Sequence, residues 1–266
     1  LDSLNSRPCF RVFISTDDTD FESIFLTIES VREQLYPDWV LYLTSEDQSN
    51  PDLYEKVSSF SDSRIKLGNS KSFDAGDWFV ELDPTTRLHQ AAFLATAIAI
   101  NENQGMSIIY TDHDHIDHSG NFCDPHMKPV WNADLFAAMD YLSPLVFCEK
   151  ELWKICMNYK SDRHNFLLEA TKNLSSSQIF HIPSVLASVQ TGYEDSYLKP
   201  PVKRPIYEVP DPEPLVSILI PTRDQGRMLK KCLESLYRET NYSNFEIVLV
   251  DHETSESKAL KVITEF

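Results

Sequence analysis

Two aspartates flank a histidine directly after an apolar stretch near the middle of this chain. The residues are Asp112, His113 and Asp114, and the apolar stretch is 106–110. Carboxylate oxygens at this spacing suit Mg²⁺ or Mn²⁺, and either ion can neutralise the charge of a departing diphosphate. Asp112 and Asp114 are therefore candidate metal ligands.

Histidines crowd the same stretch, which leaves two other interpretations open. His113, His115 and His118 lie within a few positions of one another, and imidazole nitrogens together with carboxylates can bind a metal ion. A metal-binding protein that uses this Asp-His-Asp-His cluster is one hypothesis. The same histidines are equally consistent with an ordinary solvated loop.

The elements that must position these residues alternate along the chain. Apolar patterning predicts strands at 10–14, 39–43, 64–67, 77–83 and 106–110, and helices at 20–35, 52–60 and 88–103. Such alternation indicates an α/β fold with a mostly parallel sheet that helices cover on both faces. Ligands bind beyond the carboxyl ends of strands in such sheets. The candidate segments are therefore 15–18, 45–48, 83–86 and 112–117.

The first strand–helix–strand unit occurs twice. Residues 10–43 have a counterpart at 216–250, where a strand, an amphipathic helix, a turn and a second strand follow in the same order. A solenoid is excluded, because its repeats recur every ~20 to 50 residues. We expect two copies of one α/β domain, at 1–191 and 214–266, joined by a proline-rich linker at 192–213. The second copy is expected to be the N-terminal part of its domain, within a longer chain.

Bulk composition excludes several classes of partner. The net charge of −17 over 266 residues argues against nucleic-acid binding, which needs a basic surface, and against docking on anionic lipid. The five cysteines show no C-x-x-C spacing, which indicates a reducing compartment, so we expect a cytoplasmic protein. No apolar run approaches the ~20 residues of a membrane span. Peripheral attachment to the inner membrane would have to come from other parts of a longer chain.

Several stretches resemble family 2 glycosyltransferases of the bacterial surface-polysaccharide type. Residues 110–117 and 124–135 read Tyr-Thr-Asp-His-Asp-His-Ile-Asp and Asp-Pro-His-Met-Lys-Pro-Val-Trp-Asn-Ala-Asp-Leu. The family block reads Tyr-Ser-Asp-Glu-Asp-Lys-Ile-Asp and Asp-Pro-x-x-Lys-Pro-x-Trp-Asn-x-Asp-Leu. Residues 215–224, with the strand that ends at Asp251, resemble the opening of the family's catalytic domain. Residues 181–186 are similar to its closing strand.

The resemblance implies a GT-A-like fold and a reaction. A sugar would pass from a nucleotide-diphospho-sugar donor to a hydroxyl of a glycan acceptor, with inversion, in polysaccharide or lipopolysaccharide synthesis. A divalent metal, Mg or Mn, would stabilise the departing diphosphate. A carboxylate would take the acceptor's proton, and Asp162 is the only carboxylate in the matching stretch 161–166.

The resemblance also implies a nucleotide pocket. It would be lined in the second copy by Pro221, Thr222, Arg223 and Asp251, because a carboxylate at a strand terminus can accept the imide N–H of uracil. Each of these residues, taken alone, is better explained by a turn or a helix N-cap, whereas the ordered set favours the nucleotide pocket. The corresponding positions of the first copy include Ser15 and Ser45.

The first copy departs from the family at its metal motif. The family has Leu-Asp-x-Asp-Asp where this chain keeps Asp83 but has Thr85 and Thr86 in place of the other carboxylates. One carboxylate and two hydroxyls make a poor Mg²⁺ site, and Ser45 replaces the nucleotide-binding aspartate. We therefore expect a degenerate first domain in a tandem glycosyltransferase. The alternative is a non-catalytic scaffold that binds a glycan or a partner domain.

Overall fold

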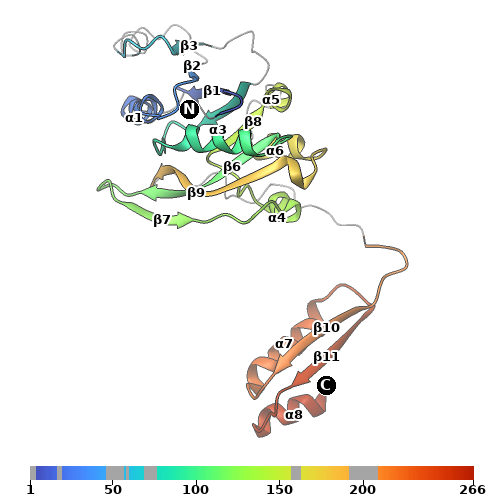
Figure 1. Ribbon diagram of the computed structural model, residues 1–266. Coiled ribbons are helices and arrows are strands. Elements are labelled where there is room, and N and C mark those ends of the chain that lie inside the picture. Colours follow the sequence, from blue (N-terminus) through green and yellow to red (C-terminus); the bar gives the residue numbers. More distant parts are fainter. Residues whose placement is uncertain are drawn as a thin grey trace. The chain divides into compact units, whose positions relative to one another are not determined.

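The computed structural model describes residues 4–16, 20–45, 57, 60–68, 77–156, 163–191 and 209–266. The chain forms two compact units, Leu1–Pro205 and Ile206–Phe266, and Figure 1 labels their elements. The predicted linker 192–213, the predicted helix 52–60 and Asp162 lie largely or wholly outside the described residues. None of the described helices combines the length and the apolar character that a bilayer crossing requires.

The first unit is built on a nine-stranded sheet. Its strands are β1 (Cys9–Ser15), β2 (Trp39–Thr44), β3 (Ile65–Leu67), β4 (Asp77–Leu82), β5 (Thr86–Leu88), β6 (Ile108–Ile116), β7 (Phe122–His126), β8 (Val146–Glu149) and β9 (Ile179–Gln190). Its α-helices are α1 (Phe21–Arg32), α3 (Ala92–Glu102), α4 (Ala133–Ala138), α5 (Lys150–Cys156) and α6 (Arg163–Thr171). The strand order is β3-β2-β1-β4-β8-β6-β9-β5, and β7 pairs with β6 outside this path.

The sheet is parallel through its first half and mixed beyond it. Strands β3, β2, β1 and β4 are mutually parallel, and so are β6 and β9. The short strand β8 runs antiparallel between β4 and β6. The predicted α/β class is therefore confirmed, and the antiparallel pairs are those that β5, β7 and β8 make with their neighbours.

Side chains of β1 alternate between two apolar layers. Phe10, Val12 and Ile14 are buried against α1 and α3 on one face. Phe13 points to the other face, where the ring of Trp153 from α5 stacks on it with ring centres 5.0 Å apart. Helices thus cover both faces of the sheet, as expected for parallel strands that are apolar throughout.

Strand β6 is longer than the sequence indicates. The apolar stretch predicts a strand that ends at 110 and a polar loop after it, but β6 continues to Ile116. The polar residues stay in the strand because β9 pairs with β6 on one side and β7 on the other. Asp112 and Asp114 therefore lie within a strand, not in a loop beyond its end.

The second unit repeats the β–α–β arrangement of the first. Its elements are β10 (Val216–Thr222), α7 (Gly226–Glu239), β11 (Phe245–Asp251) and α8 (Ser257–Glu265). The parallel registers have the same spacing in both units, since Phe10 pairs with Trp39 and Val216 pairs with Phe245. The chain therefore contains the same βαβ unit twice.

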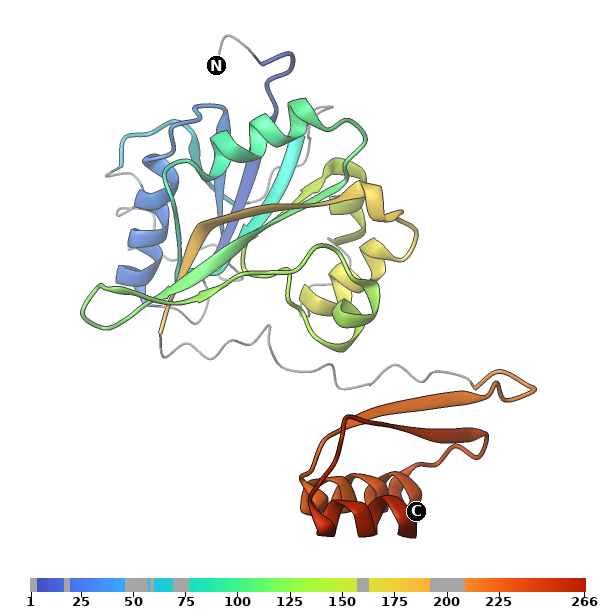
Figure 2. The ribbon, with the colours of Figure 1, turned by 60° about the horizontal axis from the view of Figure 1, so that its bottom comes forward.

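Helices cover only one face of the β10–β11 pair (Figure 2). Leu229, Leu233 and Val262 form the buried cluster on that side. On the other face Leu219, Val248 and Val250 are exposed, and the polar pair of Ser217 and Glu246 lies beside them. In the second unit taken by itself, this face of the strand pair is bare.

Gly226 allows α7 and α8 to meet. A Cβ atom at this position would lie 2.6 Å from the backbone nitrogen of Ala259 and 2.8 Å from the carbonyl carbon of Lys258. These are backbone atoms of α8, so they cannot rotate away as the end of a side chain could. A close contact between the two helices therefore requires glycine here.

We expect Gly226→Ala to destabilise the second unit by about 1–3 kcal/mol, because the added methyl group must push α8 away. Hydrogen exchange of the α7 and α8 amides in the full chain should then accelerate. Arg227→Ala, at the next and exposed position, is the matched control and should leave the exchange unchanged. Equal protection in the two variants would show that the contact is not tight.

Candidate functional site

The sheet of the first unit brings several predicted site residues to one edge. Ser15 ends β1 and pairs with Thr44, the residue before Ser45. Ile14 of β1 pairs with Leu82 of β4, the residue before Asp83. Since the three strands are parallel, Ser15, Ser45 and Asp83 follow the carboxyl ends of neighbouring strands.

Asp112 lies at the level of Asp83 in the same sheet. Phe79 of β4 and Ile108 of β6 both pair with Cys148 of β8, and β8 is antiparallel to both strands. Asp83 and Asp112 therefore lie equally far along their strands toward the same edge. One strand separates them, which corresponds to about 10 Å.

The Asp83 carboxylate is engaged in a turn. Its Oδ1 accepts hydrogen bonds from the backbone nitrogen of Thr85 at 3.0 Å and from the Thr85 hydroxyl at 2.6 Å. Thr85 and Thr86 are buried, so their hydroxyls do not face solvent beside the carboxylate. Asp83 therefore stabilises the turn that leads into β5, and it is the only acidic side chain among Asp83, Thr85 and Thr86.

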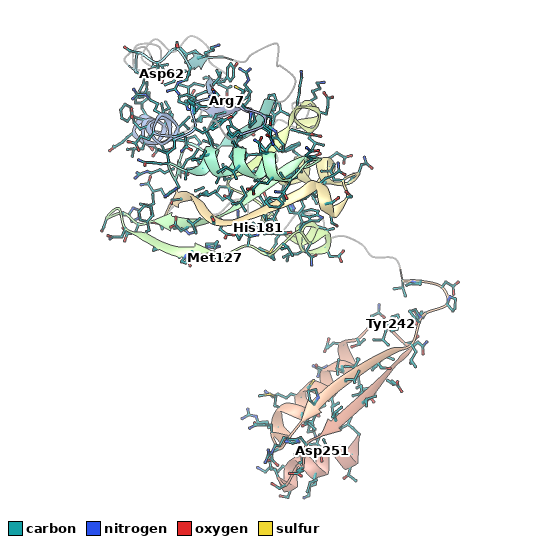
Figure 3. The ribbon with its side chains drawn as sticks, in the orientation of Figure 1. Arg7, Asp62, Met127, His181, Tyr242 and Asp251 are labelled. Atoms are coloured by element: carbon teal, nitrogen blue, oxygen red, sulfur yellow. The ribbon has the colours of Figure 1, made fainter. Side chains whose placement is uncertain are left out.

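The Asp112 carboxylate is buried and joins three segments. His181 Nε2 of β9 lies 2.7 Å from its Oδ1, and the backbone nitrogen of Lys128 donates to the same oxygen at 2.8 Å. Figure 3 labels His181 beside β6. The ring of His181 also stacks on Tyr110, with ring centres 4.8 Å apart. These bonds assign Asp112 a structural role.

Lys128 continues this network into the interior. Its ammonium group donates to the carbonyl oxygens of Leu142 and Ser143, both at 2.7 Å. Burial, opposed by the carboxylates of Asp140 and Asp112, lowers the pKa of Lys128 to about 7. The lysine therefore fixes the segment before β8 to the segment after β7.

The remaining residues of the long family-like block also support the fold. Asn132 caps α4, because its side chain accepts from the backbone nitrogen of Leu135 at 2.9 Å. The ring of Trp131 packs against Phe136, with ring centres 5.3 Å apart. The carbonyl of Pro129 accepts the Tyr110 hydroxyl at 2.7 Å. These residues of the block therefore form a framework around β6.

The three candidate metal ligands of the first unit do not converge. Asp83 caps a turn, Asp112 is bonded within the protein, and Oδ1 of Asp114 is buried with no hydrogen-bond partner among the described residues. Among the described residues, one group of three or more potential metal-ligating side chains has its ligand atoms close together. None of these three aspartates belongs to that group. Among the described residues of the first unit, these three aspartates do not together offer the open oxygen ligands that a Mg²⁺ or Mn²⁺ ion at a diphosphate would need.

The second unit places its predicted nucleotide residues side by side. Thr222 pairs with Asp251 at the carboxyl end of the β10–β11 pair, and Figure 3 labels Asp251 there. Asp251 accepts from the backbone nitrogen of Thr254 at 3.2 Å and is otherwise exposed. Pro221 and Arg223 flank Thr222 and are exposed as well. The second unit therefore has an open polar edge.

Asp224 ties together the two loops at this edge. Its Oδ1 accepts from the backbone nitrogens of Ser255 at 2.8 Å and Glu256 at 2.7 Å, and its own backbone nitrogen donates to the Thr254 hydroxyl at 3.1 Å. Asp224, with φ of 55°, and Gln225, with φ of 57°, have left-handed backbone conformations, which cost energy in residues other than glycine. The loops are thus held in one conformation by hydrogen bonds.

Sequence reasoning missed two features. Asp224 ends the family-like run 215–224, but nothing in the sequence shows that it bridges to the loop after β11. His126 was likewise not recognised as a neighbour of His113 and His115, although the hairpin formed by β6 and β7 pairs it directly with His113. A turn signal at Ser119–Gly120 was the only local indication of that hairpin.

Burial of the Asp112 contacts predicts a large effect of Asp112→Ala on stability. The substitution leaves the Lys128 backbone N–H and the His181 imidazole without their acceptor, so we expect the first unit to lose about 3 kcal/mol. Tryptophan fluorescence during urea unfolding measures the loss, since all four tryptophans lie in this unit. Asp134→Ala, at an exposed position of α4, is the control. Unchanged stability with Asp112→Ala would refute the structural role.

The backbone bonds from Glu256 and Ser255 hold the pKa of Asp224 below its usual value of 3.8. A carboxyl whose pKa is lowered by folding stabilises the folded state above pH 3.8, and that contribution is lost as the pH falls through the lowered value. We therefore expect the loops of the second unit to loosen only in strong acid. A carbon-detected NMR titration of the Asp224 carboxyl should give a midpoint below 3.8. A midpoint at or above 3.8 would contradict the bridging geometry.

Comparison with known proteins finds relatives at low sequence identity. No family model matches. The uncharacterized protein y4gI of Sinorhizobium fredii (strain NBRC 101917 / NGR234) is 26% identical over 311 residues, covering 97% of this chain and 34% of that protein. The O-antigen biosynthesis protein RfbC of Myxococcus xanthus is 22% identical over 314 residues, covering 99% of this chain and 24% of that protein. The chain spans well under half the length of either relative.

Solved structures share the fold. Residues 1–349 of S. aureus TarS in complex with UDP-GlcNAc match with a TM-score of 0.50 at 13% identity, covering 97% of this chain and 71% of that one. The UDP complex of the same protein matches with a TM-score of 0.50, covering 68% of this chain and 60% of that one. The chain therefore shares the α/β fold of the TarS structure, as predicted.

Proposed function

We propose that this chain is part of a glycosyltransferase that uses a nucleotide-diphospho-sugar donor, and that its second unit holds the nucleotide. The observation that supports this most directly is the pairing of Thr222 with Asp251 at the open edge of the β10–β11 pair. The fold shared with a UDP-GlcNAc-bound structure is consistent with this role. The acceptor would be a glycan of polysaccharide or lipopolysaccharide synthesis.

The chemistry of this edge suits a uridine diphosphate. The Asp251 carboxylate accepts from Thr254 and retains lone pairs that can accept the imide N–H of uracil. Arg223 is exposed two residues after Pro221, and a guanidinium can pair with diphosphate oxygens in a bidentate manner. Hydrogen bonds across the two loops hold both groups on a fixed backbone before a ligand arrives.

The first unit serves a different role in this proposal. Ser45 occupies the position of Asp251 in the shared register, and a serine hydroxyl cannot replace the charge of a carboxylate there. Asp83 and Asp112 are engaged in hydrogen bonds within the protein. The first unit would therefore be a non-catalytic module, and any Mg or Mn used in the reaction would bind elsewhere in the whole protein.

A second candidate is that the entire chain is a scaffold that binds a glycan or partner domains without catalysis. The bonded state of Asp83 and Asp112 favours it for the first unit. It differs from the first candidate in one measurable respect, because a scaffold of this kind has no need of a nucleotide. Binding of UDP by the second unit separates the two.

We expect UDP to bind the full chain, and Asp251→Asn to weaken binding about 10- to 100-fold, the usual cost of removing a hydrogen bond to a charged group. Isothermal titration calorimetry with and without Mg²⁺ or Mn²⁺ measures the affinity. Glu246→Gln is the matched control, since Glu246 lies on the same strand at its other end and should bind UDP like the unaltered chain. Asp83→Ala should also leave the affinity unchanged.

Absence of any UDP binding by the full chain would favour the scaffold. Equal losses with Asp251→Asn and Glu246→Gln would mean that strand β11, and not its terminal carboxylate, is what the ligand requires. Weaker UDP binding with Asp83→Ala would indicate that the nucleotide binds to the first unit.

A further inference from the structure

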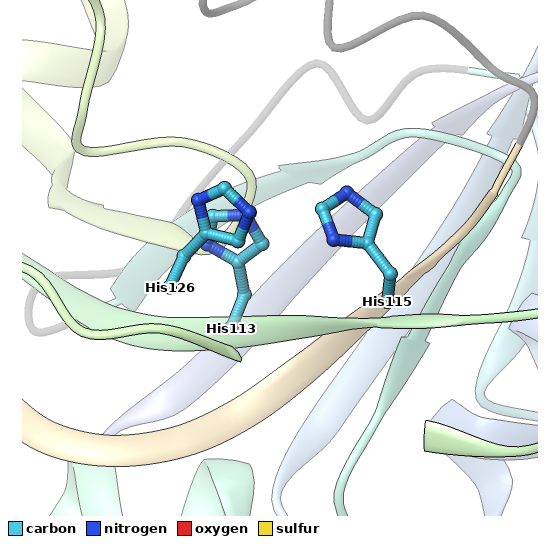
Figure 4. A group of neighbouring side chains, drawn as sticks. All are labelled: His113, His115 and His126. Atoms are coloured by element: carbon cyan, nitrogen blue, oxygen red, sulfur yellow. The ribbon is translucent and has the colours of Figure 1, made fainter. Parts of the chain in front are cut away.

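Three histidines meet on one side of the β6–β7 hairpin. His113 and His115 are two positions apart on β6, so their side chains leave the same face of the strand. His126 of β7 is paired with His113 across the ladder. Figure 4 shows the three rings standing on one side of β6. One ring nitrogen from each residue lies within 4.8 Å of the other two.

The rings are packed closely and are partly shielded from water. The His113 and His126 rings stack, with centres 4.6 Å apart and planes 14° apart, and the His115 ring stands across both, with centres 5.7 Å and 5.0 Å away. His113 and His115 are buried, at 2% and 5% exposure. His126 is half-buried. The cluster is therefore open to solvent on the His126 side.

Imidazole side chains are common ligands of transition metals. A neutral imidazole has one ring nitrogen with a lone pair, and that nitrogen binds Zn²⁺ and other transition metals. The three side chains bring one such nitrogen each to the same place.

An oxygen partner lies beside the histidines. Oδ2 of Asp124 is 3.3 Å from His126 Nε2 and 3.8 Å from His115 Nδ1. Asp124 has a left-handed φ of 49°, which is uncommon outside glycine, and it lies where the pairing of β7 with β6 changes register between His113 and His115. In metal sites a carboxylate so placed either completes the coordination or accepts the second N–H of a ligating imidazole.

We propose that His113, His115 and His126 form a binding site for a transition-metal ion of the Zn²⁺ type, with Asp124 as its oxygen partner. Three imidazoles suit Zn²⁺, Cu²⁺ or Ni²⁺ and not Mg²⁺ or Ca²⁺, which prefer oxygen. Zn–N bonds of 2.0–2.1 Å in tetrahedral geometry need nitrogens about 3.3 Å apart. Small side-chain rotations that draw the rings inward achieve this.

The site is separate from the sugar-donor chemistry. It uses none of Asp83, Asp112 and Asp114, and the family block has glutamate and lysine where this chain has His113 and His115. A bound ion would join β7 to β6 and so hold the segment that leads to Lys128. We assign it a stabilising role in the hairpin. The proposal stands or falls independently of nucleotide binding by the second unit.

The test is metal titration of the full chain, prepared without a histidine tag and stripped with a chelator. We expect one Zn²⁺ per chain, and Co²⁺ in its place should give the visible absorption of a tetrahedral site. Loss of a residue that hydrogen-bonds to a metal ligand typically lowers metal affinity about 10- to 100-fold. We expect Asp124→Asn to lower Zn²⁺ affinity within this range, and His126→Asn to lower it by more. His126 is chosen because it is half-buried, so the variant should fold.

His118→Asn is the matched control, because His118 is an exposed neighbour in the same hairpin and lies outside the cluster. It should bind Zn²⁺ like the unaltered chain. Zn²⁺ should also raise the urea midpoint of the first unit in the unaltered chain and the control, but not in His126→Asn. Equal Zn²⁺ affinity in His126→Asn and the unaltered chain, or equal losses in His118→Asn and His126→Asn, would overturn the proposal.

Discussion

The buried carboxylate of Asp112 is the interaction on which the first unit depends most. A charge removed from water is tolerated only when hydrogen bonds replace its hydration, and here those bonds come from His181 on β9 and from the backbone before Pro129. The chain after β7 must therefore return to β6, and the hairpin that carries His113, His115 and His126 is held in register as a consequence. Lys128, which donates to carbonyls before β8, extends the same constraint across the sheet.

The two units show how a fold can persist while its site changes. Both have a parallel strand pair with the same spacing and a helix between the strands, because apolar alternation and a helical period suffice to build that unit. The residues just beyond the strands can change without disturbing this apolar pattern. In the first unit Ser15 and Ser45 occupy the positions that Pro221 and Asp251 have in the second unit. The second unit also has a loop network centred on Asp224. Function must therefore be argued from these ends, and not from the fold.

The sequence predicted those parts of the fold that depend on local patterns. The α1 and α3 helices, strands β1, β2 and β4, and the repeat in the second unit follow from apolar periodicity alone. The extension of β6 did not, because its polar residues are buried by pairing partners far away in the chain, on β7 and β9. The candidate residues at strand ends could be located because ligands bind beyond the carboxyl ends of parallel strands. Their hydrogen bonds could not be predicted, since Asp112 reaches His181 only when β9 is paired with β6.

The bare face of the β10–β11 pair has a consequence for the second unit. Two strands are too few to bury an apolar layer between helices on both sides, and sheets of parallel strands in α/β proteins are normally covered on each side. Leu219, Val248 and Val250 instead form a strip that favours contact with another apolar surface over contact with water. The cohesion of residues 209–266 on their own therefore rests on the single apolar layer of Leu229, Leu233 and Val262, and on the hydrogen bonds of Asp224 that join the loops at the strand ends.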